Sequence, residues 1–308
     1  MLTRLFSHSK PIAFAILGIL FSMAFFIENF ISTSFELNAA LFFKKIGVLV
    51  VFLLIIFLLN FIVKRNNIHN QHTYAISSFV LLIIAFPEIL RSSDFVLAYF
   101  FLLLSFRRIL SLKTNTHIKQ KILDSGLLLS VSIWFEPTHW LFLLVIYFGV
   151  IMYASQNYRH FIIPLVGLGV GFLLHFCFFL IFENTWTRYS YYLPEYKGVD
   201  TFFESFKYGI LLGLLVLILV WIIFRLPIIY NKSKLHVRES LSLTLFFMLI
   251  SVSVLGLNNT PLSRDAIYLI WPLSIFIGSY FQMRSTRKWT KEVLYLAFVS
   301  GIIFSAIY

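Results

Sequence analysis

Residues 46–63, IGVLVVFLLIIFLLNFIV, decide the fold class of this chain. The stretch contains no charged residue, and Asn60 is its single polar side chain. A helix of about 20 apolar residues spans the hydrocarbon core of a bilayer and satisfies its own backbone hydrogen bonds. Residues 46–63 therefore predict a transmembrane helix, which Lys64 and Arg65 follow directly.

The composition of the whole chain agrees with this interpretation. Of its 308 residues, 60% are hydrophobic, 12% are charged and 37 are phenylalanine, whereas a soluble domain averages about 45–50% apolar and 25% charged residues. A soluble globule of this size would leave much of its apolar surface in water. Disordered, collagen-like and disulfide-stapled chains are also excluded, because there are 13 glycines, 8 prolines and a single cysteine, Cys177.

Eleven apolar runs predict an all-α, polytopic integral membrane protein with about 11 transmembrane helices in a single domain, residues 1–308. The runs Phe95 to Ile109 and Ile122 to Phe135 are short, at 15 and 14 residues, and Pro87 interrupts the run from Tyr74 to Ile89. If the hairpin from Tyr74 to Ile109 does not span, nine helices remain and every later segment keeps its side. The runs are approximately Pro11 to Ile27, Ile46 to Val63, Tyr74 to Ile89, Phe95 to Ile109, Ile122 to Phe135, Trp140 to Ala154, Phe161 to Phe182, Tyr208 to Phe224, Leu241 to Leu257, Ala266 to Gln282 and Val293 to Ile307.

The charged residues predict the orientation. With a cytosolic N-terminus and eleven crossings, the inner segments hold 18 of the 25 lysines and arginines but only three of the 13 acidic residues. This asymmetry obeys the positive-inside rule and predicts an N-in, C-out protein of a bacterial inner (cytoplasmic) membrane. The net charge of +12 is then explained by anionic lipid headgroups, so we expect membrane lipids and no nucleic acid as partners.

The other ten acidic residues lie in the predicted outer segments. Glu28, in FFIENF, follows the first run directly, and Glu36 comes next in STSFEL. A carboxylate that is partly desolvated at the edge of a membrane cavity is suited to accept a proton from a hydroxyl. Glu28 is thus the leading candidate for a catalytic base, with Glu36 as the second. The alternative is that these acids solvate outer loops and that Glu28 ends a helix at the interface.

Two outer arginines are candidates for binding a lipid phosphate. Arg264 precedes a run that carries Tyr268, and Arg188 lies in the aromatic loop of residues 183–206. A planar guanidinium forms bidentate bonds with phosphate, and aromatic rings can stack on a sugar. The alternatives are an ion pair between Arg264 and Asp265, and anchoring of the aromatic rings among headgroups.

Glu136 and His139, in WFEPTHW, are the outer acid and histidine that lie close in sequence. They predict either a proton relay at a substrate site or, more simply, a tight turn. No HxxxH, CxxC or HExxH spacing occurs, so we expect no metal and no cofactor. Gly167, Gly169 and Gly171, in GLGVG, predict close helix packing rather than a nucleotide site.

Several of these features together resemble the GT-C class of polyprenyl-phosphate-sugar-dependent glycosyltransferases. They are an N-in first helix with an acid at its outer end, an aromatic outer loop in the second half, and an Arg-x-x-x-Tyr-x-x-x-Pro element formed by Arg264, Tyr268 and Pro272. The basic stretch that leads into residues 126–144, GLLLSVSIWFEPTHWLFLL, also resembles the middle helices of that class.

The resemblance implies a cavity open to the outer leaflet, in which a carboxylate matching Glu28 activates an acceptor hydroxyl. Cations matching Arg264 and Arg188 would hold the lipid phosphate. The chain departs from the class in its first outer loop, whose only acids are Glu28 and Glu36 and which two lysines close. We therefore expect a protein that handles a lipid-linked sugar, either as a glycosyltransferase or as a catalytically degenerate relative.

Two other functions remain open. A noncatalytic scaffold subunit of an envelope complex would explain the lack of a strong catalytic motif, and it would require a protein partner. A small-molecule transporter would use the weak runs between residues 74 and 135, although charges within the runs are nearly missing and no inverted repeat is visible.

Overall fold

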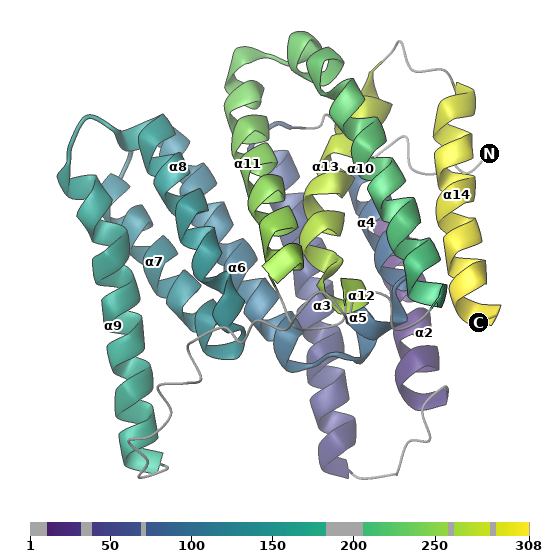
Figure 1. Ribbon diagram of the computed structural model, residues 1–308, viewed down its shortest axis with the longest axis horizontal. Coiled ribbons are helices and arrows are strands. Elements are labelled where there is room, and N and C mark those ends of the chain that lie inside the picture. Colours follow the sequence, from purple (N-terminus) through teal and green to yellow (C-terminus); the bar gives the residue numbers. More distant parts are fainter. Residues whose placement is uncertain are drawn as a thin grey trace. The chain divides into compact units, whose positions relative to one another are not determined.

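The computed structural model is helical wherever it has regular structure. A helix occurs in each of the eleven predicted runs (Figure 1). The all-α prediction is therefore confirmed for the part of the chain that the structure describes, which comprises residues 11–31, 39–68, 72–182, 206–257, 262–283 and 288–307.

Seven helices within these ranges are long and apolar enough to cross a membrane, which indicates a membrane protein. Two further runs form shorter apolar helices, α4 (Tyr74–Ile84) and α13 (Ile267–Gln282). The count of eleven crossings and the N-in orientation stay predictions. The seven candidate spans are Ile12–Ile31, Ala39–Arg65, Phe95–Thr114, Pro137–Ala154, Arg159–Ile181, Gly209–Lys232 and Leu235–Gly256.

The chain divides into two compact units. The first comprises Met1–Ser93, Val199–Leu241 and Thr260–Tyr308, and the second comprises Asp94–Gly198 and Ser242–Asn259. Both consist of apolar helices. This division neither confirms nor contradicts the prediction of a single transmembrane domain.

The core of the first unit is the pair α4 and α13, whose residues are buried almost throughout. Helices that are apolar on every side are buried ones, and here neighbouring helices pack around the pair (Figure 1). The other elements of this unit are α2 (Pro11–Phe26), η1 (Ile27–Ile31), α3 (Ala39–Arg65), α5 (Pro87–Arg91), α10 (Phe206–Lys232), α12 (Leu262–Asp265) and α14 (Lys288–Ile307).

Pro87 separates α4 from α5. The preceding residue, Phe86, has φ −115° and ψ 84°, outside the helical region, as a following proline favours. Pro87 itself occupies the first turn of α5, where a missing N–H removes no helical hydrogen bond. The break turns the chain at the end of α4 and creates a short helix that ends with Arg91.

Glycines allow two helices of the second unit to pack closely. A Cβ atom on Gly167 would lie 2.6 Å from the carbonyl oxygen of Leu123, and one on Gly171 would lie 1.7 Å from Oγ of Ser130. The predicted close packing is confirmed at these two glycines, whereas a Cβ on Gly169 would meet nothing within 4 Å. The unit contains α6 (Asp94–Leu110), η2 (Ser111–Thr114), α7 (Ile118–Phe135), η3 (Pro137–Phe142), α8 (Leu143–Ala154), α9 (Arg159–Phe182) and, from Ser242 onward, α11 (Leu235–Leu257).

Large apolar side chains are exposed on both units. Phe224 of α10 is 76% exposed and Ile181 of α9 is 73% exposed, and each has many apolar neighbours that are also exposed. Soluble monomers rarely present such continuous apolar surface, whereas a membrane protein presents it to lipid tails. The surfaces therefore agree with the composition.

Candidate functional site

A group of charged and polar side chains lies at one end of the first unit. There α5 packs against both η1 and α12, and a lysine from the start of α3 reaches the same place. The charge pattern predicts all four segments on the outer side of the membrane. We call this group the outer cluster and define it as Glu28, Asn29, Lys45, Arg91, Arg264 and Asp265.

Glu28 forms an ion pair with an arginine that sequence analysis did not select as a site residue. It lies in η1, the π-helical turn that extends α2, and its Oε1 atom forms an ion pair with Nη2 of Arg91 from α5. The Glu28 side chain is 16% exposed. The carboxylate is thus largely withdrawn from solvent, and its charge is balanced by the guanidinium.

Asn29 and Lys45 connect the same elements. Nζ of Lys45 donates to Oδ1 of Asn29 at 2.7 Å and to the carbonyl oxygen of Arg91 at 3.2 Å. Nδ2 of Asn29 donates to the carbonyl oxygen of Leu90 at 3.1 Å. Sequence analysis missed Asn29, Lys45 and Arg91 as site residues. The available signal was that each is a polar residue at the end of an otherwise apolar run.

Arg264 forms the ion pair that was the alternative to phosphate binding. Its Nε donates to Oδ1 of Asp265 at 3.2 Å, and Asp265 is 1% exposed. A guanidinium has five N–H donors, so a bond through Nε does not exclude a phosphate contact. Tyr268 lies fully buried in the first turn of α13.

Glu136 and His139 belong to the second unit, where they build the turn at η3. His139 is fully buried, and its Nδ1 is hydrogen-bonded to Oγ of Ser132. Because Ser132 donates its proton to the carbonyl oxygen of Ala98 at 2.7 Å, it accepts the proton of His139 Nδ1. Oε1 of Glu136 accepts from Thr138 at 3.3 Å. These contacts support the tight turn, and the proton relay stays a prediction.

Two predicted site residues, Glu36 and Arg188, lie outside the described residues. Of the others, Glu28, Arg264 and Tyr268 belong to the first unit. Within the described ranges, no group of three or more His, Cys, Asp or Glu side chains could hold a metal ion. The outer cluster is therefore the place where predicted site residues and new ones occur together.

Comparisons with known proteins identify a family but no activity. No curated protein and no solved structure matches the chain, so these comparisons add no support to the resemblance to GT-C glycosyltransferases. One family model, described as a family of unknown function (DUF6427), matches residues 1–307. Because the match spans nearly the whole sequence, the chain belongs to the DUF6427 family.

Proposed function

We propose that this protein is a multi-pass protein of the bacterial cytoplasmic membrane that binds a lipid-linked phosphate at the outer cluster. The observation that carries the proposal is the ion pair of Glu28 with Arg91 beside Lys45. Two cations and a carboxylate thereby lie together at one end of the membrane-length helices. Guanidinium and ammonium groups at the height of the headgroups are suited to hold a phosphate.

The ion pair suggests how binding of a phosphate makes the carboxylate of Glu28 available as a base. A phosphate that approaches Arg91 competes with Glu28 for the guanidinium, because both are anions that bind the same N–H donors. When the phosphate takes Arg91, the Oε1 atom of Glu28 is released. The carboxylate then becomes available as a base only when the lipid phosphate is in place.

With a polyprenyl-phosphate sugar as the substrate, the proposed reaction is glycosyl transfer. Glu28 accepts the proton of an acceptor hydroxyl, whose oxygen forms a bond with the anomeric carbon. The bond between that carbon and the phosphate oxygen breaks, and the polyprenyl phosphate leaves with the electron pair. Arg91 and Lys45 stabilise the charge that develops on this phosphate.

Binding of a radiolabelled polyprenyl phosphate to the purified full chain in a nonionic detergent tests the proposal. Arg91→Ala removes a charge-assisted hydrogen bond, so we expect the Kd to rise about tenfold or more. Glu28→Gln should keep the phosphate bound and abolish transfer of the sugar.

Arg108→Ala is the matched control for the loss of an arginine from an ion pair. Nη2 of Arg108 lies 3.2 Å from Oδ2 of Asp124 in the second unit, and Arg108 is about as exposed as Arg91, at 44% against 48%. This variant should bind polyprenyl phosphate like the wild type. An equal Kd for Arg91→Ala and Arg108→Ala would exclude the outer cluster as the phosphate site.

A second candidate function is a noncatalytic membrane subunit, and the same contacts favour it. Arg91 already holds Oε1 of Glu28, an oxygen that would have to accept the proton if Glu28 were a base. Nζ of Lys45 is likewise bonded to Oδ1 of Asn29, at 2.7 Å. In a noncatalytic subunit, the role of these paired side chains would be to fix the helix ends. Affinity purification of the full chain in mild detergent distinguishes the two functions. A stoichiometric protein partner without phosphate binding supports the subunit, and a lone protein that binds polyprenyl phosphate argues against it.

A further inference from the structure

An open cavity lies at the other end of the first unit. The end of α3, the turn between α10 and α11 and the end of α13 border it, and its volume is about 760 Å³. This volume falls within the range of about 300–1,000 Å³ that is typical of small-ligand sites. With about 1.5 Å of rise per residue, the 20 steps along α3 from Lys45 to Arg65 place the cavity roughly 30 Å from the outer cluster. The two sites are thus separated by about the thickness of a membrane.

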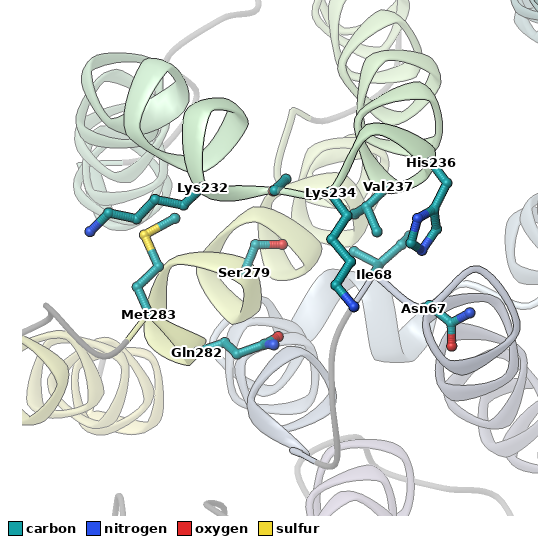
Figure 2. A pocket seen from close by; sticks show the side chains of 10 residues that line it. Asn67, Ile68, Lys232, Lys234, His236, Val237, Ser279, Gln282 and Met283 are labelled. Carbon is teal, nitrogen blue, oxygen red and sulfur yellow. The ribbon is translucent and has the colours of Figure 1, made fainter.

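Cations and hydrogen-bond donors line this cavity. Figure 2 shows Lys234 extending into it toward the amide of Gln282, with His236 and Asn67 on one side and Lys232 on the other. No carboxylate occurs among the described residues that line it. The lining therefore suits an anion.

The backbone holds Asn67 firmly at the edge of the cavity. Asn67 has φ 53°, a left-handed conformation that asparagine adopts more readily than most residues. Its N–H donates to the carbonyl oxygen of Lys64, and the N–H of Ile68 donates to that of Val63, both at 3.1 Å. This pair of bonds is a Schellman motif, which ends α3 and satisfies its last carbonyl groups.

Hydrogen bonds of Ser233 and Arg238 fix the turn that carries the two lysines. Nε of Arg238 donates to the carbonyl oxygen of Ser233 at 3.0 Å, and Oγ of Ser233 donates to that of Ile229 at 2.7 Å. The carbonyl oxygen of Lys234 accepts from the N–H groups of Val237 and Arg238. These bonds hold the backbone of Lys232 and Lys234 at the edge of the cavity.

We propose that this cavity binds a phosphate group, carried either by a lipid headgroup or by a free phosphorylated molecule. Lys232 and Lys234 supply positive charge, and the amides of Asn67 and Gln282 supply neutral donors. The three bordering segments are those that the charge pattern predicts in the cytosol, next to the leaflet rich in anionic lipids. A cavity larger than a bare phosphate leaves room for the group esterified to it.

The helix dipoles reduce the positive charge of the cavity without cancelling it. The C-terminal ends of α3, α10 and α13 border the cavity, and each contributes about −0.5 charge, while the N-terminus of α11 contributes about +0.5. The two lysines contribute two full positive charges. A net charge of about +1 therefore remains to attract a phosphate.

Thermal unfolding of the purified full chain in a maltoside detergent, which contains no phosphate, tests this proposal. One titration uses inorganic phosphate against chloride at equal ionic strength, and the other uses phosphatidylglycerol added to the micelles. A saturable rise in Tm gives an apparent Kd for each probe. A rise with inorganic phosphate identifies a free phosphate as the source, and a rise with phosphatidylglycerol alone identifies a lipid headgroup.

Lys234→Gln should weaken binding of the effective probe about fivefold, the usual effect of one lysine near a membrane surface. Lys232→Gln provides a second, independent test should Lys234→Gln unfold. The control is Lys119→Gln, which makes the same charge change at an exposed lysine of α7. The proposal is overturned if neither probe gives a saturable rise, or if Lys119→Gln weakens binding as much as Lys234→Gln.

Discussion

Nζ of Lys45 donates to Oδ1 of Asn29 at 2.7 Å, and this bond joins the start of α3 to the end of the preceding helix. Asn29 is 1% exposed, and its Nδ2 donates to the carbonyl oxygens of Phe25 and Leu90, both at 3.1 Å. One buried amide thereby connects three segments of the outer cluster. A buried polar group with all its partners fixes geometry, whereas the loss of one partner leaves the others unsatisfied.

We expect Asn29→Ala to lower the free energy of unfolding by about 1–3 kcal/mol. The change leaves the carbonyl oxygen of Leu90 without this donor and Lys45 without this acceptor. A fall in Tm of the purified protein in detergent measures the effect. Asn66→Ala is the control, because Nδ2 of Asn66 donates to the carbonyl oxygen of Ile62, four residues earlier in the chain, at 2.9 Å. Equal Tm values for the two variants would contradict the assigned role of Asn29.

The helices of this protein could be predicted from the sequence, because the length and hydrophobicity of a run are local properties. Residues 46–63 lie entirely within α3, and Pro87 marks the break between α4 and α5. The partner of Glu28, in contrast, depends on which helix ends meet in space. Nothing near Arg91 in the sequence links it to η1, so the ion pair could not be predicted. The burial of Asn29 likewise depends on α5.

Gly167 and Gly169 of α9 provide a second prediction with its control. A Cβ on Gly167 would lie 2.6 Å from the carbonyl oxygen of Leu123 and 3.1 Å from Cα of Gly126. These are backbone atoms that cannot rotate away, so α7 and α9 must separate. We expect Gly167→Ala to destabilise the protein by about 1–3 kcal/mol. Gly169→Ala meets nothing within 4 Å and should leave Tm unchanged or raise it, since alanine favours helix. A loss of Tm in Gly169→Ala as large as in Gly167→Ala would refute the close contact.

A buried hydroxyl pair links α4 to α14. Oη of Tyr295 lies 2.5 Å from Oγ of Ser77, and neither side chain is more than 1% exposed. In a double-mutant cycle of Tyr295→Phe and Ser77→Ala, we expect a coupling energy of about 0.5–1.5 kcal/mol, because each change removes the same hydrogen bond. Thermal or denaturant unfolding of the four proteins measures it. Strictly additive losses would mean that the two hydroxyls do not stabilise one another.

The two ends of the first unit should be accessible from opposite sides of the membrane. After replacement of Cys177 by serine, single cysteines at Ser92 and Lys234 report on the end of α5 and on the basic cavity. Because cytosolic segments carry the excess of lysines and arginines, a membrane-impermeant maleimide should label Ser92→Cys in intact spheroplasts and Lys234→Cys only after permeabilisation. Lys119→Cys, predicted to be cytosolic and exposed on α7, should behave like Lys234→Cys. The reverse pattern would show that the orientation is opposite to the predicted one. Ser92 follows Arg91, which contacts Lys45 near the start of α3, and Lys234 lines the cavity at the end of α3. Labelling of both cysteines from the same side would therefore show that α3 does not cross the membrane.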